Sequence, residues 1–158
     1  MKRFLLLMVL CAAISTGANA QINMLAVNNN NTSCDVYFVV YGVEAGGGCT
    51  ATHSSNTLLS LPPTGSIPPS DPSTFPGFLN CFAGSPPCGA VLLGPADDFL
   101  YAEIYNGDPN CGGTPVGFVG EVCTGQPTSI VYPAYTGGGC AGCGMVTATW
   151  SGGTLTFN

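Results

Sequence analysis

Nine cysteines carry the most evident chemistry of this 158-residue sequence. Cys11 falls in an apolar N-terminal stretch, which leaves an even set of eight. In an exported chain an even set predicts disulfides, whereas redox and zinc sites need reduced thiols. The segment Cys140-Ala141-Gly142-Cys143 has C-x-x-C spacing, but it follows a glycine run and does not open a helix, where a reactive thiolate is stabilised. We therefore predict four disulfides among Cys34, Cys49, Cys81, Cys88, Cys111, Cys123, Cys140 and Cys143.

The spacing of the cysteines leaves their pairing open. Cys81 and Cys88 form the best local pair, since only six residues lie between them. Longer crosslinks, from Cys34 or Cys49 to a later strand, would close larger loops and stabilise the fold more.

Residues for acid–base or nucleophilic catalysis are few. His53 is the only histidine, and no G-x-S-x-G or similar nucleophile motif accompanies it. A lone histidine in a Ser/Thr-rich segment is expected at the surface. Asp97, Asp98 and Glu103 could supply carboxylates for glycoside hydrolysis, but adjacent strand residues point to opposite faces. We predict no catalytic residues and a protein that is not an enzyme.

Asn106, Asp108 and Asn110 alternate as oxygen ligands do in the first half of an EF-hand loop. The match is partial, because Cys111 stands where that loop has glycine and no helix flanks it. A plain turn that uses the same side chains explains the pattern equally. These three residues are the candidates for a structural calcium site, and the sequence indicates no other cofactor.

Aromatic side chains are numerous enough to form a binding surface. Such rings, beside hydroxyl and amide groups, can bind sugars without any charge, although tyrosines in alternating strands often pack within a sheet. Tyr101, Tyr105 and Trp150 are the candidate binding residues. The full set is Tyr37, Tyr41, Tyr101, Tyr105, Tyr132, Tyr135 and Trp150.

Residues 1–20 have the three parts of a secretory signal peptide. Lys2 and Arg3 form a basic start, residues 4–14 are apolar but too few to span a bilayer, and Ala18-Asn19-Ala20 is a small-residue cleavage site. Cleavage after Ala20 predicts a secreted, extracellular protein, with a periplasmic location left open. Residues 21–158 would then form one exported domain.

Cleavage also removes every lysine and arginine from the protein. Lys2 and Arg3 are the only two, so the formal charge changes from −6 to −8. Nucleic-acid binding needs basic side chains for phosphate neutralisation and is excluded, as is attachment to anionic lipid. The expected partner is an extracellular protein or a glycan. Self-association through sheet edges also stays open, because no lysine protects them.

Alternating apolar residues and frequent turns predict an all-β fold. Residues 34–43 form the strongest strand, with apolar residues on both faces, and we expect it at the centre of a sheet with cover on both sides. The prolines of residues 61–78 predict a long irregular loop, and the four asparagines 28–31 predict a turn. Further strands are expected at 21–27, 57–61, 91–93, 99–105, 116–122, 129–132, 145–150 and 154–157, the last two as a hairpin.

About eight short strands and eight cysteines indicate a small, disulfide-rich antiparallel β-sandwich or barrel-like domain. The leading hypothesis for function is a non-catalytic structural or adhesion-type domain outside the cell. One alternative is a carbohydrate-binding module that uses exposed Tyr and Trp. Another is a protease-inhibitor-like domain that presents the proline-rich segment 61–78.

Overall fold

The structure of the protein is a computed structural model, which describes residues 22–77, 79–82, 92–135 and 144–158. The predicted signal peptide lies outside these residues. Within them, the chain is all-β with two short 3₁₀ helices. In chain order the elements are β1 Leu25–Asn29, β2 Val36–Val43, β3 His53–Ser55, β4 Leu59–Leu61, β5 Ser66–Ser70, β6 Leu79–Cys81, β7 Asp98–Tyr105, η1 Pro109–Cys111, β8 Pro115–Gly120, η2 Val122–Thr124, β9 Ser129–Pro133, β10 Met145–Ser151 and β11 Thr154–Phe157.

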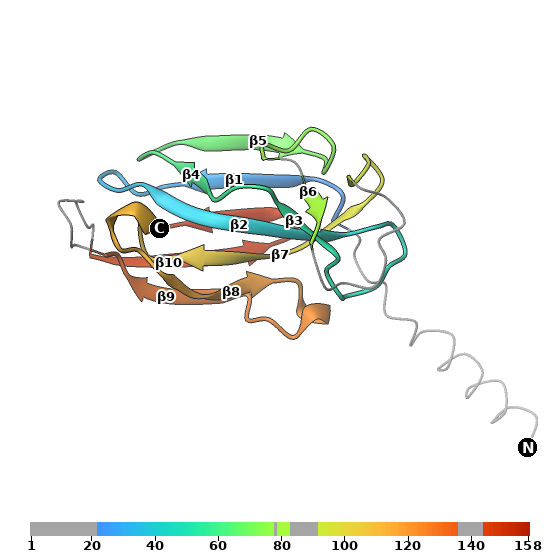
Figure 1. Ribbon diagram of the computed structural model, residues 1–158. Coiled ribbons are helices and arrows are strands. Elements are labelled where there is room, and N and C mark those ends of the chain that lie inside the picture. Colours follow the sequence, from blue (N-terminus) through green and yellow to red (C-terminus); the bar gives the residue numbers. More distant parts are fainter. Residues whose placement is uncertain (1–21, 78, 83–91, 136–143) are drawn as a thin grey trace, which may run out of the picture.

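The strands form two sheets (Figure 1). Sheet A has the order β5-β1-β11-β10-β9, and sheet B has the order β6-β3-β2-β7-β8, with β4 also paired to β2. The two ladders are separate, so the barrel-like alternative is wrong. Every pairing is antiparallel except β1–β11, which is parallel. That exception is feasible because all of sheet B lies between these strands in sequence, which provides the long crossover that parallel neighbours need.

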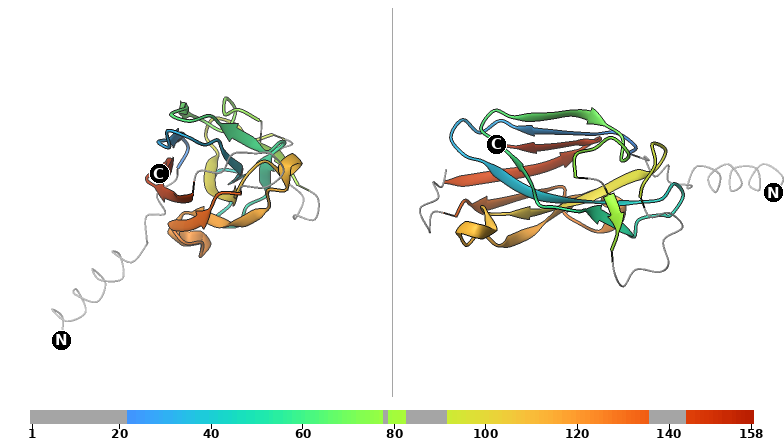
Figure 2. Two further views of the ribbon diagram at one scale, coloured as in Figure 1. Left: turned by 90° about the vertical axis from the view of Figure 1, so that its left-hand side faces the viewer. Right: turned by 45° about the horizontal axis from the view of Figure 1, so that its top comes forward.

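The two sheets face each other (Figure 2). Their inner faces bury a common apolar core. Phe38 of β2 meets Phe157 of β11 across this core, with ring centroids 5.6 Å apart. Burial of large apolar side chains from both layers is the main stabilising contribution to such an arrangement. None of the helices in the described ranges is long and apolar enough to cross a membrane.

The predicted central strand is confirmed at the middle of sheet B, where β2 pairs with β3, β4 and β7. Val36, Phe38 and Val40 face the core and are buried. On the outer face Tyr37 and Tyr41 are half-buried and Val43 is buried in a small second cluster, so the predicted cover on that side is only partial. No second layer packs on the outer face of β2 in the described chain; neighbouring side chains shield it partly.

Strict alternation over 99–105 predicts Leu100, Ala102 and Ile104 on one face and Phe99, Tyr101, Glu103 and Tyr105 on the other. A β-bulge in β7 overturns this prediction. Tyr41 pairs with Tyr101 but Gly42 pairs with Phe99, so Leu100 is the extra residue. A bulge shifts the alternation by one residue. Phe99 therefore enters the main core with Ala102, whereas Leu100 joins a small cluster on the other side.

The segment 61–78 contains a strand where irregular structure was predicted. Ser66–Ser70, which includes Pro68 and Pro69, is β5 and pairs with β1 at the edge of sheet A. An edge strand tolerates proline because it needs ladder bonds on one side only. Phe75, farther along, is buried and packs on Phe99 with ring centroids 5.1 Å apart. The continuous exposed loop that the inhibitor hypothesis assumed is therefore not present.

Of three smaller predictions, one is confirmed and two are wrong. The C-terminal hairpin is confirmed, and Gly152 and Gly153 form its two-residue turn with φ of 52° and 79°, as a type I′ turn requires. Asn28 and Asn29 belong to β1 and not to a turn. The segment 91–93 is not a strand in its described part, where Leu92 forms only an isolated bridge with Asn80.

One disulfide is placed between Cys49, after β2, and Cys123, in η2 just after β8. Their Cα atoms are 5.6 Å apart and 74 positions separate them in sequence, a long crosslink of the predicted kind. Cys34, Cys81 and Cys111 are disulfide-bonded as well. Cys88, Cys140 and Cys143 lie outside the described residues, and so do the predicted Cys81–Cys88 pair and the C-x-x-C segment.

Candidate functional site

Tyr101 stands on the outer face of sheet B within an aromatic patch. Its ring stacks on Tyr41 with centroids 4.7 Å apart and an interplanar angle of 20°. Phe118 meets both rings edge-on, and Phe82 meets Tyr41 in the same way. Stacked rings cover each other's faces, and a sugar needs an open ring face, so the stacking leaves less of Tyr101 available to a ligand.

Glu103 is the polar centre of this outer face. Its Oε2 accepts hydrogen bonds from the hydroxyls of Tyr41 at 3.2 Å and Tyr105 at 3.4 Å. Burial, and secondly the charge of Glu103, raises the pKa of Tyr41, Tyr101 and Tyr105. Tyr105, the second predicted binding residue, is therefore oriented toward a neighbouring carboxylate.

Trp150, the third predicted binding residue, is in the core. It is 2% exposed, and its indole Nε1 donates a hydrogen bond to Glu121 Oε1. The prediction of an exposed tryptophan is thus wrong. In β10 the buried residues alternate with outward-facing threonines, and Trp150 falls on the buried side of this alternation.

Two of the three predicted calcium ligands, Asp108 and Asn106, each use a side-chain oxygen to accept hydrogen bonds from protein donors. Asp108 Oδ1 accepts from the backbone N–H of Asn110 at 2.8 Å and from its side-chain amide at 3.0 Å. Asn106 Oδ1 accepts from the Thr114 N–H at 2.8 Å. These bonds belong to a turn and to the N-terminal cap of η1. No group of three or more His, Cys, Asp or Glu side chains suited to a metal is found among the described residues.

The candidate acid–base residues are buried or hydrogen-bonded within the fold. His53 is fully buried in β3, with its Nδ1 2.8 Å from Thr52 Oγ1, so the predicted surface position is wrong. Asp97 accepts backbone N–H bonds from Ala45 and Gly94 at 2.7 and 2.6 Å. Asp98 is buried at the start of β7.

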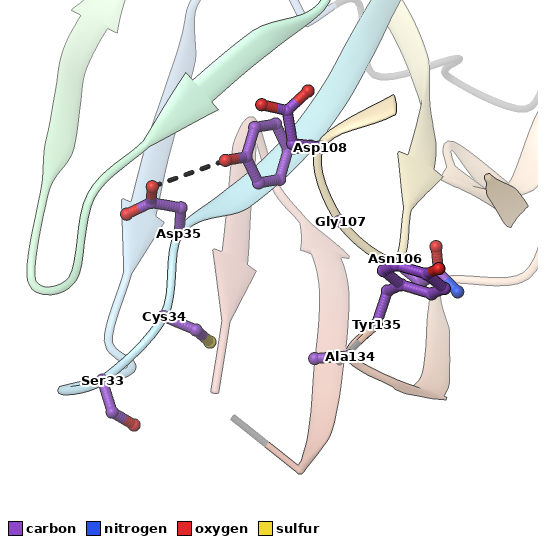
Figure 3. A pocket seen from close by; sticks show the side chains of 9 residues that line it. Ser33, Cys34, Asp35, Asn106, Gly107, Asp108, Ala134 and Tyr135 are labelled. Carbon is purple, nitrogen blue, oxygen red and sulfur yellow. Dashed lines mark hydrogen bonds between the residues drawn. The ribbon is translucent and has the colours of Figure 1, made fainter. Parts of the chain in front are cut away.

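A cleft of about 240 Å³ brings together residues that the sequence suggested for two different sites, the aromatic surface and the calcium site (Figure 3). It lies where the β1–β2 connection, the turn after β7 and the chain after β9 converge. Ser33, Cys34, Asp35, Tyr37, Asn106, Gly107, Asp108, Ala134 and Tyr135 line it. The backbone N–H of Tyr135 donates to the Asn106 carbonyl at 2.7 Å and so joins two of the walls.

Close backbone packing shapes one side of this cleft. Gly112 ends η1 with φ of 97°, and a Cβ at this position would lie only 2.7 Å from the Tyr135 hydroxyl. Glycine therefore satisfies both the left-handed backbone and the close approach of the ring. The Tyr135 side chain is half-buried there and remains a wall of the cleft.

Two carboxylates act on Tyr37 in the cleft. The Tyr37 hydroxyl donates to Asp35 Oδ2 at 3.4 Å (Figure 3). Burial, then the charge of Asp35, then that of Asp108 raises the pKa of Tyr37. Among the hydrogen bonds of the described residues, none uses Asp35 Oδ1 or Asp108 Oδ2. The cleft therefore offers carboxylate oxygens beside phenol rings, without a basic side chain.

Ionisation of the tyrosines should destabilise the fold at alkaline pH. In the folded protein the pKa values of Tyr37, Tyr41, Tyr101, Tyr105 and Tyr132 are raised, with burial as the leading cause. The stability they contribute is complete below the unfolded value of about 10 and is lost as pH rises through the folded values. We expect the urea midpoint to fall only above about pH 10.

The measurement is urea unfolding across this range, with tyrosinate absorbance recorded after a rapid pH jump. The tyrosines of the native protein should ionise at higher pH than those of the urea-unfolded protein. Tyr41→Phe should reduce the loss of stability at alkaline pH. Simultaneous ionisation of all tyrosines near pH 10, with a constant urea midpoint, would contradict the expectation.

The sequence alone did not predict that these residues would line one cleft. The sequence predicts separate roles for Tyr37, Tyr135, Asn106 and Asp108, and it gives Asp35 none beyond its negative charge. Two turn signals indicate that loops carry some of these groups: the asparagine run before Asp35 and the Asn-Gly-Asp-Pro segment at 106–109.

Neither a protein-family model, nor a curated protein, nor a solved structure matches this chain.

Proposed function

We propose that the protein is an exported, non-catalytic β-sandwich domain of the adhesion type, which holds a cationic group of an extracellular partner in the Tyr37 cleft. The observation that carries this proposal is the convergence of Asp35, Asp108 and two phenol rings on one cleft. Carboxylates attract ammonium or guanidinium groups, and aromatic ring faces bind cations as well. Lys2 and Arg3 are the only lysine and arginine of the chain and both lie in the predicted signal peptide, so no Lys or Arg side chain of residues 21–158 competes for the cleft.

The expected affinity for one cationic group is low. Ion pairs and cation–π contacts at exposed sites each contribute about 1 kcal/mol or less. A sum of two or three corresponds to a Kd in the millimolar range or weaker. Repeated amines on one partner would raise the overall binding through avidity. This favours attachment to a polymer or a protein surface, either an amino-sugar chain or a lysine-bearing segment.

Asp35→Asn is expected to weaken the binding of amine-bearing probes about five-fold, because one exposed charge contact of about 1 kcal/mol is removed. The probes are a glucosamine oligomer, its N-acetylated counterpart and an oligolysine peptide, titrated calorimetrically into the mature protein. The two charged probes should bind and the acetylated one should not. The stronger of the two identifies the source of the cation.

The matched control is Asp71→Asn, which removes one carboxylate from the turn after β5. Its remaining side-chain oxygen can still accept from the Ser73 N–H, and its new amide can donate to the Thr74 hydroxyl. It should leave binding within two-fold of the original. An equal effect of both substitutions would mean that net charge, and not the cleft, attracts the probes. Tyr37→Leu should weaken binding as Asp35→Asn does, because it removes the ring.

A further inference from the structure

The outer face of sheet A carries a row of uncharged polar side chains across all five strands. Register places Ser66 beside Asn28, Asn28 beside Thr156, Thr156 beside Thr149, and Thr149 beside Ser129. Each of them is half-buried or exposed, and their strand neighbours point into the core. We call Ser66, Asn28, Thr156, Thr149 and Ser129 the hydroxyl row.

Shorter polar ranks lie on both sides of the hydroxyl row. On one side Thr154 pairs with Ser151, and on the other Thr147 exchanges backbone hydrogen bonds with Asn158. Next to the second rank, Asn30 Nδ2 donates to Asn158 Oδ1 at 2.9 Å. Within the hydroxyl row, the hydroxyls of Ser129 and Thr149 are 3.1 Å apart.

The strands of this face carry no charged side chain. None of the eight carboxylates belongs to β1, β5, β9, β10 or β11. In a chain whose acidic groups would draw cationic partners elsewhere, an uncharged face complements a neutral partner. Hydroxyl and amide side chains both donate and accept hydrogen bonds, as the hydroxyls of a sugar do.

The geometry selects an elongated partner. Neighbouring strands lie about 4.8 Å apart, so five strands give the hydroxyl row a length of about 19 Å. Successive strands are also rotated by about 20–25°, which curves the row. A rigid flat surface could contact only part of it, whereas a flexible chain can follow it.

From this row we infer a second binding surface: it holds one extended chain of a neutral polysaccharide, laid across the strands of sheet A. Val131 and Met145, both 61% exposed, lie toward one end of the face and can pack on the C–H groups of the sugar rings. This surface is independent of the Tyr37 cleft, which belongs to other elements and takes a charged ligand.

Affinity electrophoresis of the mature protein in native gels tests the inference, with hydroxyethylcellulose, xylan or galactomannan cast in the gel. At least one of these polymers should retard the protein. Thr149→Val/Thr156→Val should weaken retardation at least ten-fold, because it removes two adjacent hydroxyls of the row. Valine has nearly the shape of threonine and favours strands, and it leaves the charge and the mobility in polymer-free gels unchanged.

Two controls locate the binding surface. Thr57→Val, in the turn before β4, should be retarded like the original protein. Asp35→Asn should also be retarded equally, so loss of the cleft function and loss of the hydroxyl row can be told apart. No retardation of the original protein by any of the three polymers, or equal retardation of Thr149→Val/Thr156→Val, would overturn the inference. Dimerisation through this face without polymer binding would overturn it as well.

Discussion

Asn29→Asp is expected to lower the free energy of unfolding by about 3–5 kcal/mol at pH 7, the usual effect of an uncompensated buried charge. Asn29 is 1% exposed. Its side-chain amide donates to the carbonyls of Cys34, Leu61 and Pro62 at 2.9, 3.1 and 2.9 Å. Aspartate has the same shape but would direct an oxygen at three carbonyl oxygens. The measurement is urea unfolding followed by circular dichroism.

Asn28→Asp is the matched control for this prediction. It makes the same chemical change one residue earlier, on the outer face of β1, and should change the free energy of unfolding by about 0.5 kcal/mol or less. A comparable loss in both variants would contradict the role of the buried amide.

The effect of Asn29→Asp should also depend on pH. Burial disfavours the charged carboxylate and so raises the pKa of the new group in the folded state. Stability is then lost as pH rises above the unfolded value of about 4. We therefore expect a smaller deficit at pH 4 than at pH 7, measured against the original protein at each pH. A deficit independent of pH would show that lost hydrogen bonds dominate over charge.

Removal of the Cys49–Cys123 bridge is expected to lower the free energy of unfolding by about 4 kcal/mol. The bridge spans 74 positions, and in the chain-entropy model a crosslink of this length restricts the unfolded chain by about that amount. The variant is Cys49→Ser/Cys123→Ser, so that neither cysteine is left to pair wrongly. Urea unfolding without reductant gives the difference.

The fold of this variant should stay intact, because the bridge ends lie in connections outside the main core. Far-ultraviolet circular dichroism and mass mapping of the remaining disulfides check this. A loss of less than about 1 kcal/mol with the fold intact would mean that the unfolded chain already holds these two segments together.

Local pattern was a reliable guide wherever packing followed strict alternation. The apolar and aromatic run of β2, bounded by turns, made a central strand predictable. With apolar residues on both faces, it did not single out the inward side, which Phe38 occupies. The final hairpin was predictable as well, because Gly152 and Gly153 allow the positive φ values of a two-residue turn. In β7 alternation failed at Leu100, since one bulged residue exchanges the faces and leaves no mark in composition.

Tertiary context decided the residues whose types suit more than one setting. Asn29 resembled a turn residue, yet it is buried, and its amide donates to the nearby Cys34 carbonyl and to the Leu61 and Pro62 carbonyls of a distant segment. Pro68 resembled a loop residue, but an edge position in sheet A accepts it. Trp150 resembled a binding residue until the second sheet covered it.

The sequence by itself determined the all-β class, the strong acidity outside residues 1–20 and the even set of cysteines after Cys11, because these depend on residue type and short-range alternation. Only the tertiary structure decided which strands are neighbours, and hence the two candidate surfaces. Asp35 and Asp108 line the same cleft, and Asn28 pairs with Thr156 in the hydroxyl row. The residues of each pair are more than seventy positions apart in sequence, and long-range strand pairing, which no local pattern encodes, brings them together.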